Sequence, residues 1–290
     1  MTAPAPHRPR RLLATGAALL LALPLATALF GPLLAPLVTP ADGAPYARGG
    51  GHPLGTDGMG RDVLGLLLRG GPSALGVATG AVALAYLLGG TLGLAAAASR
   101  HQAVDEILMR PVEILLPLPS LLVISVVGVG WRGQPLAIAL TVAALNVPAV
   151  ARLVRAAALD AAGSPVAEAM RMQGESRSRV LFGHIGRAVL PVAAADIGTR
   201  IATAVFTVAA ANFLGLGMEP TSADWGVTVA GSREALLVQP WAVCAPAAML
   251  VMFTVGLNLL ADRLLAPAAE AGTAAPAGRA LAVRAEEAPE

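Results

Sequence analysis

The sequence predicts an all-α membrane protein with six transmembrane helices, and three observations lead to that prediction. Hydrophobic residues make up 56% of the 290 residues and charged residues only 13%, whereas charged residues form about 25% of ordinary soluble domains. The mean hydropathy is +0.70. The apolar residues are gathered into six long runs, and a helix of about 20 predominantly apolar residues is long enough to cross a bilayer.

The first apolar run, residues 12–38, follows a short basic start with three arginines among residues 1–11. Two interpretations stay open for this run. It exceeds the length of about 7 to 15 residues of a signal-peptide core, which favours a membrane helix, whereas the small residues 26–28 have the character of a signal-peptide cleavage site. We assign residues 1–38 to an N-terminal tail and a first membrane helix.

Residues 39–71 are rich in glycine and proline, which predicts an external loop with tight turns of positive φ. Within this loop, Asp62 is placed to cap a short helix that carries Val63 and Leu64. The loop also contains His52 and acidic side chains but no complete catalytic constellation, so a structured loop is favoured over an enzyme site. No catalytic and no metal-binding residue is therefore assigned.

Five further apolar runs complete the predicted set: residues 72–98, 111–131, 135–151, 188–216 and 241–261. The third of the six runs contains Pro117 and Pro119, which are expected to kink it. The fifth run contains two charged residues, Asp196 and Arg200, one helical turn apart. Mutual pairing is favoured over contact with a substrate, because an unpaired charge is costly inside a membrane.

The longest polar interval between two apolar runs is residues 160–191, which predicts two short amphipathic helices joined at a glycine. Ser164 and Pro165 form a favourable helix start. Gly174 is predicted to end that helix in a left-handed conformation. A second helix is expected to begin at Glu175, supported by an ion pair with the arginine four residues further on.

The first of these two helices is expected to have one face made by residues at three- and four-residue spacing: Val166, Ala169, Met170 and Gln173. Glu168 falls in its first turn, where the helix dipole favours an anion. Spacing alone does not separate this arrangement from an ordinary loop on the membrane surface, and both interpretations stay open.

The distribution of arginine predicts the orientation. Placing the N-terminus, the polar turn 99–110, the stretch 152–187 and a disordered tail 263–290 on one side collects 14 arginines there, against five on the other side, with Arg200 inside a run. Cytoplasmic loops carry the excess of basic residues in membrane proteins. Both termini and the stretch 160–191 are therefore expected in the cytoplasm.

All 20 basic residues are arginine. A phosphate-binding Walker A loop requires lysine, so ATP and Mg²⁺ are expected on another chain. This chain is expected to be a transport subunit without a cofactor of its own, rather than an enzyme. The net charge of only +2 gives no reason to expect nucleic acid as a partner, and the single cysteine, Cys244, permits no disulfide within the chain.

Three motifs resemble a known family. Glu168-Ala169-Met170, followed by Gly174 and later by a Leu-Pro pair, resembles the EAA loop of ABC importer permeases, which docks into a groove on the ATPase subunit. The sequence HPLGTDGMGRDVL at residues 52–64 resembles a signature of the dipeptide, oligopeptide and nickel branch, as does FLGLG at residues 213–217. Met170 replaces an alanine of the family's pattern, and the Leu-Pro pair comes four residues late.

The resemblance covers roughly residues 52–262. It implies a type I ABC importer permease fold with a cytoplasmic coupling helix and a transmembrane domain at residues 72–262. The residues that it assigns to coupling with the ATPase are Glu168, Ala169, Met170, Arg171, Gly174 and Glu175. The residues that it assigns to the external-loop signature are His52, Gly55, Thr56, Asp57, Gly60, Arg61 and Asp62.

The resemblance also implies an assembly in the lipid of a bacterial cytoplasmic membrane: a heterodimer with a second permease subunit, two ATP-binding-cassette ATPases and an external solute-binding protein. The implied task is ATP-driven import of peptides, with nickel or metal chelates as the alternative cargo. An alternative of another class is a self-sufficient channel or ion-coupled carrier. That class is disfavoured because no internal repeat is evident, and only Asp196 and Glu113 are candidate intramembrane acids.

Overall fold

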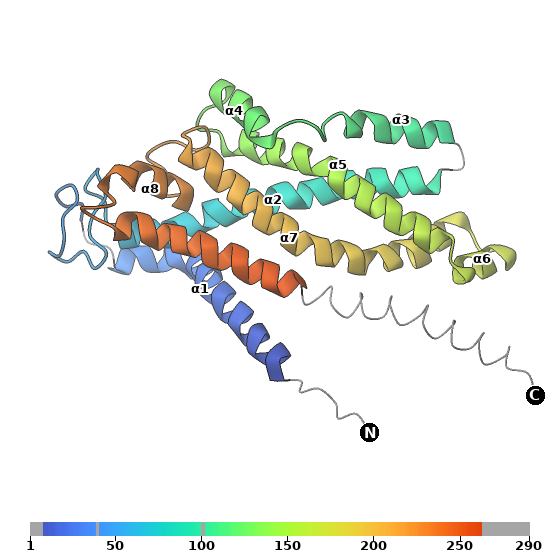
Figure 1. Ribbon diagram of the computed structural model, residues 1–290, viewed down its shortest axis with the longest axis horizontal. Coiled ribbons are helices and arrows are strands. Elements are labelled where there is room, and N and C mark those ends of the chain that lie inside the picture. The colour runs from blue at the N-terminus through green and yellow to red at the C-terminus, as the bar shows by residue number, and fades with distance from the viewer. Residues whose placement is uncertain (1–7, 39–40, 100–101, 263–290) are drawn as a thin grey trace, which may run out of the picture.

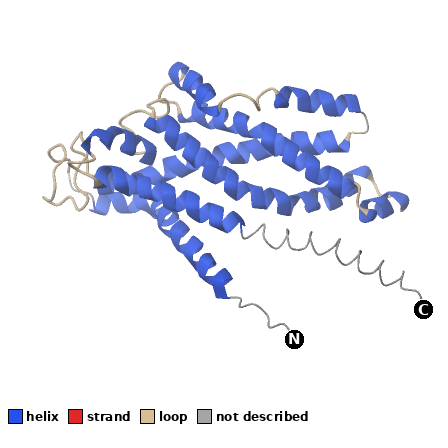
Figure 2. Ribbon diagram, in the orientation of Figure 1, coloured by secondary structure: helices blue, strands red, loops and turns tan. Residues whose placement is uncertain are grey.

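The computed structural model describes residues 8–38, 41–99 and 102–262 as an elongated bundle of helices (Figures 1 and 2). The described part of the chain contains isolated bridges but no strand. The helices are α1 Arg8–Val38, α2 Val63–Ala98, α3 Gln102–Glu113, α4 Ser120–Gly130, α5 Pro135–Ala162, α6 Pro165–Met172, η1 Arg179–Ile185, α7 Gly186–Phe213, α8 Trp225–Ser232, η2 Arg233–Ala235 and the last described helix, Trp241–Asp262.

The prediction of an all-α membrane protein is confirmed. Five helical segments of the described ranges are long and apolar enough to cross a membrane: Thr15–Val38, Val63–Ala98, Pro135–Ala162, Arg179–Phe213 and Trp241–Asp262. Four of them lie on predicted runs with shifted ends, and the last matches its predicted run within one residue. The chain is therefore a multi-pass membrane protein.

The expectation of one continuous helix over residues 111–131 is wrong. The chain there is divided into α3, a turn, and the 11-residue helix α4. Pro119 has an extended backbone and precedes the first residue of α4, and a proline also disfavours helical geometry at the residue before it. The two prolines therefore interrupt the helix rather than kink it. Residues 99–110, expected in a turn, lie largely in α3.

Two other boundaries differ from the expected ones. Asp62 is a helix cap as predicted, since its Oδ2 accepts a hydrogen bond from the backbone N–H of Gly65 at 2.7 Å. The helix that it starts is not short, however, because α2 continues through Pro72 for 36 residues. Membrane helices tolerate an internal proline, because neighbouring helices and local adjustments of the backbone can satisfy the freed carbonyl group. Helix α5 likewise extends to Ala162, well beyond the expected end at residue 151.

The centre of the bundle is the contact between α2 and α5. Gly89 and Gly93, one turn apart on α2, face the backbone of α5. A Cβ on Gly89 would lie 2.7 Å from the carbonyl oxygen of Val147, and a Cβ on Gly93 would lie 3.0 Å from the backbone nitrogen of Arg155. Small residues let membrane helices approach this closely, where packing replaces the hydrophobic effect.

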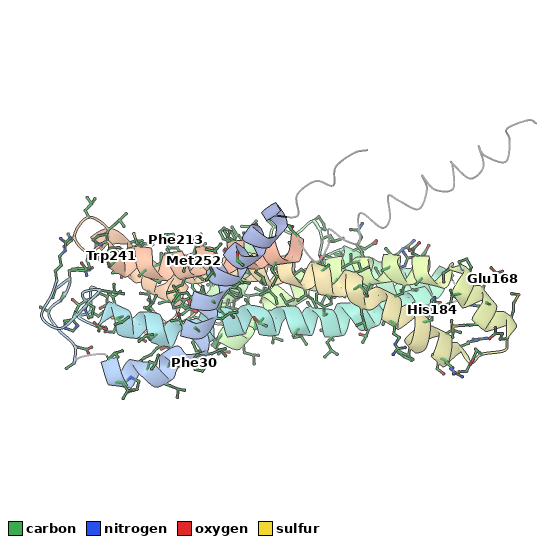
Figure 3. The ribbon with its side chains drawn as sticks, turned by 90° about the horizontal axis from the view of Figure 1, so that it is seen from below. Phe30, Glu168, His184, Phe213, Trp241 and Met252 are labelled. Carbon is green, nitrogen blue, oxygen red and sulfur yellow. The ribbon has the colours of Figure 1, made fainter. Side chains whose placement is uncertain are left out.

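The bundle has two dissimilar ends. Residues 41–62 and α8 lie at one end and α6 lies at the other (Figure 1). Seen from another side, the labelled residues Glu168 and His184 lie at the α6 end, and Trp241 lies at the opposite end (Figure 3). The start of α1 and the end of the last described helix both point toward the α6 end. The loop end and the α6 end are separated by the length of the spans.

Candidate functional site

The start of α6 is fixed by Ser164. Its Oγ accepts a hydrogen bond from the backbone N–H of Ala167 at 3.3 Å and lies 3.0 Å from Nε2 of His184 in η1. The first contact is the predicted N-cap. The second was not predicted, because His184 is 20 residues away in the chain and nothing local indicates the pairing. Together they join the start of α6 to the beginning of the next membrane span.

The end of α6 is fixed by Gly174. Its φ is +78°, the left-handed conformation predicted from the sequence. The backbone N–H of Glu175 donates to Met170 O at 3.1 Å and that of Gly174 donates to Arg171 O at 3.1 Å. This pair of bonds is the Schellman motif, which closes a helix at a left-handed residue. A Cβ at Gly174 would meet no atom within 4 Å, so backbone conformation, not space, favours glycine there.

Helix α6 packs on the bundle through only part of the face that its spacing predicts. Ala167 is fully buried and Met170 packs against the core of the α6 end. Val166 and Gln173, which were expected to share a face with Met170, are exposed, and the exposed fraction of Val166 is 55%. The reason is that α6 leaves α5 after the turn at Gly163, and the direction of that turn, which spacing alone does not specify, decides which face meets the bundle.

The second short helix does not exist as a separate element. A π-helix, η1, begins at Arg179 and runs directly into α7, and the two form one span of 35 residues. The Leu190-Pro191 pair lies inside α7 rather than at a helix end. The predicted ion pair is confirmed, since Arg179 Nη1 lies 3.1 Å from Glu175 Oε2. The short helix of the coupling stretch is therefore α6 alone.

At the α6 end, the six residues assigned to coupling lie on α6 and directly after it. Glu168, Arg171 and Gly174 are exposed, and Ala169, Met170 and Glu175 are partly buried. The structure brings them together on one compact projection that is capped at both ends.

At the opposite end, the loop of residues 41–62 is built around Asp57. The Oδ1 of Asp57 accepts hydrogen bonds from the backbone N–H of Met59 at 2.9 Å and of Arg61 at 2.8 Å, and its Oδ2 accepts from Arg61 Nε at 2.8 Å. Arg61 Nη1 then donates to the carbonyl oxygen of Thr221 at 2.8 Å. The Asp57–Arg61 pair thus ties the loop to the segment before α8.

The remaining signature residues also have structural partners. Nδ1 of His52 lies 2.9 Å from Asp62 Oδ1, in a pair that is almost fully buried. The hydroxyl of Thr56 donates to Ala44 O at 2.6 Å, and Gly55 and Gly60 have φ values of +75° and +82°. All seven signature residues are therefore brought together in one folded loop.

Sequence analysis missed a buried cluster beneath this loop. Asp224 caps α8 and is 1% exposed, and its carboxylate accepts hydrogen bonds from Asn212 Nδ2 at 2.8 Å and Ser73 Oγ at 3.0 Å. Burial raises the pKa of Asp224, and the hydrogen bonds from Asn212 and Ser73 oppose the rise. The Trp225 indole, fully buried, donates to Leu67 O at 2.8 Å. The signal available was an aspartate directly before an apolar helix.

Several charged residues between the two ends form ion pairs. Asp196 and Arg200 form the expected ion pair, and the Tyr86 hydroxyl adds a hydrogen bond to Asp196 Oδ2 at 2.5 Å. Asp105, which lies in the stretch expected to be a polar turn, forms an ion pair with Arg155 in α5. Arg200 and the Asp105–Arg155 pair line an open cavity of about 830 Å³ between α3, α5 and α7.

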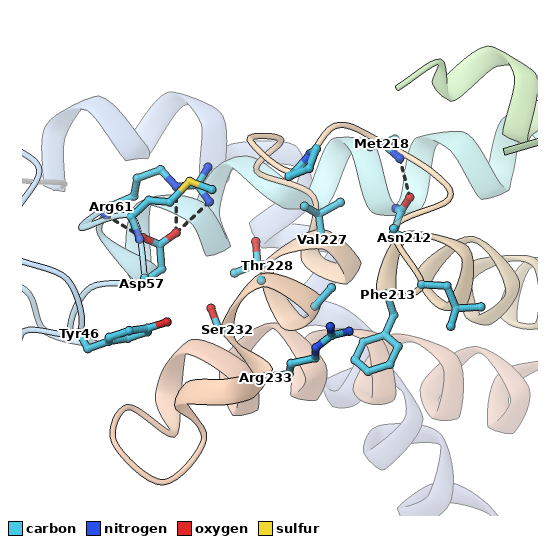
Figure 4. A pocket seen from close by; sticks show the side chains of 17 residues that line it. Tyr46, Asp57, Arg61, Asn212, Phe213, Met218, Val227, Thr228, Ser232 and Arg233 are labelled. Carbon is cyan, nitrogen blue, oxygen red and sulfur yellow. Dashed lines mark hydrogen bonds and ion pairs between the residues drawn. The ribbon is translucent and has the colours of Figure 1, made fainter. Parts of the chain in front are cut away.

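A second cavity, of about 430 Å³, lies at the loop end between residues 46–61, the end of α7 and α8 (Figure 4). Its wall combines apolar side chains and hydroxyl groups with Asp57 and two arginines, Arg61 and Arg233. Within the ranges that the structure describes, no group of three His, Cys, Asp or Glu side chains is arranged to hold a metal ion.

The fold and its two ends define an integral membrane component of a transport system. The chain belongs to the family of binding-protein-dependent transport system inner membrane components, whose model matches residues 89–266. It is a permease component of such a system.

Similar proteins come from several bacteria. The Di/tripeptide transport system permease protein DppC of Pseudomonas aeruginosa is 32% identical over 219 residues, which cover 73% of this chain and 69% of the relative. The Probable D,D-dipeptide transport system permease protein DdpC of Escherichia coli K12 is 31% identical, covering 73% and 70%. The Glutathione transport system permease protein GsiD of Pectobacterium atrosepticum is 30% identical, with the same coverage.

Proposed function

We propose that this permease subunit imports short peptides, delivered by an external binding protein, across the bacterial cytoplasmic membrane at the expense of ATP hydrolysed by a separate subunit. The relatives named above are described for di- and tripeptides, D,D-dipeptides and glutathione, and all of these are short peptides. Nickel or metal chelates, the alternative cargo, have no such support among these relatives. The absence of lysine from the sequence supports a separate ATPase that carries ATP and Mg²⁺.

The proposed assembly contains a second permease subunit, two ATPases and the binding protein. Both termini and α6 are proposed to lie in the cytoplasm, since the side with α6 carries 14 arginines against five on the other. The loop of residues 41–62 then faces the binding protein. Each end of the bundle meets one class of partner.

The observation that carries this proposal is the shape of α6. It projects beyond the ends of the spans (Figure 1) and is closed by Ser164 at one end and Gly174 at the other. Its exposed face carries Met172, which is 79% exposed, and Val166, beside the charged Glu168. A helix with fixed ends moves as a unit, so a displacement imposed by an ATPase reaches α5 and η1 directly.

A pair of substitutions at Gly174 tests the role of α6. Gly174→Val places a β-branched residue at positive φ, where it is strained, whereas Gly174→Asn adds a side chain of similar size that tolerates this conformation. Both side chains enter open space. The readout is ATP-dependent uptake of labelled Ala-Phe into proteoliposomes that contain the whole transporter.

We expect Gly174→Val to lose uptake and to retain the ATPase poorly at normal membrane abundance, while Gly174→Asn keeps most of both. Equal uptake by wild type and Gly174→Val at equal abundance would show that the stretch is an ordinary surface loop. Absence of peptide uptake by the wild-type assembly, with ATP and a loaded binding protein present, would reject the proposed cargo.

The proposed orientation is tested by labelling single cysteines in a Cys244→Ala background. Met59 is 59% exposed at the loop end and Arg177 is exposed at the α6 end. Met59→Cys is expected to react with a membrane-impermeant maleimide in intact cells, and Arg177→Cys only after permeabilisation. Reaction of position 177 in intact cells would reverse the orientation.

A further inference from the structure

The cavity at the loop end contains polar groups that the fold itself does not use. Ser232 lines it and is 1% exposed, and its hydroxyl has no hydrogen-bond partner among the described residues. The phenol of Tyr46 lies across the cavity and is likewise unpartnered within the described ranges. Figure 4 shows the ring of Tyr46 pointing toward Ser232. A hydroxyl that is buried but directed at a cavity retains the capacity to bind a ligand atom.

Tyr46 has an unusual backbone conformation, and its neighbours leave room for its side chain. It has a φ of +56°, the only non-glycine residue with positive φ in the described part of the chain. Its backbone N–H donates to Asp57 O at 3.1 Å, which helps to hold this conformation. A Cβ on Gly58 would lie 2.5 Å from the Tyr46 hydroxyl, so glycine at position 58 makes room for the phenol. Backbone strain of this kind is concentrated at ligand-binding sites.

Besides these two hydroxyls, the cavity contains the positive charge of Arg233. Arg233 lines the same cavity and stacks over Phe213, with 5.8 Å between the guanidinium carbon and the ring centroid. No carboxylate of the described residues lies within ion-pair distance of it. Its place directly after α8 is one where the helix dipole favours a positive charge. Arg233 therefore presents a charged, planar donor group to the cavity without a carboxylate partner among the described residues.

The other charged groups of the cavity are already occupied. Asp57 accepts three hydrogen bonds, and Arg61 is used by Asp57 and Thr221. The polar groups of the cavity that remain available to a ligand are the guanidinium of Arg233 and the hydroxyls of Ser232 and Tyr46. The remaining wall is apolar and includes Leu214, Met218 and Val227. This combination fits a ligand that joins a carboxylate to an apolar side chain.

We propose that this cavity receives the C-terminal residue of a peptide as it enters the permease, with Arg233 and Ser232 binding the terminal carboxylate and the apolar wall receiving the side chain. Tyr46 closes the opposite side. This inference rests on the proposed function and adds to it a binding subsite at the loop end of this chain. A carboxylate suits a guanidinium because two N–H groups can donate to its two oxygens.

Protection of a single cysteine tests the subsite directly. Gly231 lines the cavity, and a Cβ there meets no atom within 4 Å, so Gly231→Cys in a Cys244→Ala background is a suitable reporter. The assembled transporter, purified without its binding protein, is treated with a maleimide in the presence of Ala-Phe or of Ala-Phe amide. Ala-Phe is expected to slow the labelling, and the amide, which lacks the carboxylate, is expected to protect much less.

Arg233→Gln is expected to raise the half-protecting concentration of Ala-Phe by roughly tenfold or more, and Arg233→Lys by less. Arg132→Gln is the matched control, since Arg132 is also exposed at this end but lies outside the cavity. It should leave protection unchanged. Thermal unfolding of each variant verifies that the fold is retained.

Several results would overturn the subsite. The first is equal protection of the Gly231→Cys thiol by Ala-Phe and by Ala-Phe amide. The second is unchanged protection by Ala-Phe when Arg233→Gln is added. The third is protection of this thiol by the peptide-free binding protein but not by the peptide. The last would make the cavity a docking surface for that protein. Peptide uptake by the wild-type transporter without any protection would reject the subsite and leave the proposed function standing, whereas the absence of uptake would reject the proposed function itself.

Discussion

The two ends of the bundle are held in place differently. At the loop end, hydrogen bonds join parts of the chain that are far apart in sequence, such as Gln239 Nε2 to Leu54 O at 2.6 Å and the Trp225 indole to Leu67 O at 2.8 Å. At the α6 end, Ser164–His184 is, among the described residues, the side-chain hydrogen bond that ties α6 to another element.

The two ends therefore differ in how readily they move. Regions with many buried, mutually bonded groups open only at a large free-energy cost, whereas regions with few such contacts move readily. The loop end is therefore suited to hold a ligand in a fixed geometry. The α6 end is suited to be moved by a partner, because α6 is internally rigid but lightly attached.

The largest effect is expected at the loop end. Trp225→Ala removes a fully buried indole and its hydrogen bond to Leu67, and a buried Trp→Ala change costs about 3–5 kcal/mol. The free energy of unfolding, measured in detergent by titration with SDS, should fall by that amount. Trp241→Ala is the control, since Trp241 is 56% exposed at the same end. Equal losses in the two variants would contradict the contrast between buried and exposed groups.

A smaller loss is expected for Asp224→Ala. The substitution leaves the buried amide of Asn212 and the backbone N–H groups of Gly226 and Val227 without their acceptor. Each unpaired buried donor costs about 1–3 kcal/mol, and removing the desolvation cost of the buried carboxylate itself offsets part of that sum. The same SDS titration measures the change, and a stability equal to that of wild type would show that water replaces the carboxylate at no cost.

The pH dependence of Asp224 has a definite sign. Burial raises its pKa in the folded state above the ordinary value of 3.8, so the folded protein holds this proton to a higher pH than the unfolded chain does. The associated stabilisation is present below pH 3.8 and is lost as the pH rises through the raised pKa. Relative to Asp224→Asn, which does not titrate, wild type should therefore become less stable as the pH rises above 3.8 and through the raised pKa of Asp224.

At the α6 end, substitution of an exposed residue should change coupling but not stability. Met172 is 79% exposed, so Met172→Asp should alter the free energy of unfolding by less than about 0.5 kcal/mol. It should nevertheless reduce the amount of ATPase that co-purifies, because the proposed contact is apolar there. Leu237→Asp, at a side chain that is 94% exposed at the opposite end, should leave the ATPase bound. Full retention of the ATPase in Met172→Asp would argue against this face of α6 as the contact.

The smallest effect is expected for Glu175→Gln. The Glu175–Arg179 pair is separated by 3.1 Å, and the arginine side chain is 70% exposed. Solvent screens such pairs, which contribute about 0.2–1 kcal/mol, and helical pairs at this spacing about 0.3–0.5 kcal/mol. A change of several kcal/mol would mean that the junction of α6 and η1 is held more firmly than its exposure suggests.

Features that depend on neighbours within about four residues could be predicted from the sequence. The apolar runs predicted the spans, Asp62 and Ser164 were identified as helix caps, and Gly174 was expected to be left-handed. These are properties of local backbone geometry and of side chains that reach their own helix ends. The Asp196–Arg200 pair belongs to the same class, since both partners lie one turn apart.

Features that depend on distant contacts were decided only by the tertiary structure. The interruption between α3 and α4, the buried face of α6, and the cluster of Asp224 with Ser73 and Asn212 all required the positions of elements far apart in the chain. The cavity beside Arg233 likewise forms where a loop, α7 and α8 meet. Sequence by itself determined that helices form and where they are capped, because those choices are local. Which polar groups are buried together and which remain free for a ligand follows from packing, because it depends on what each helix meets.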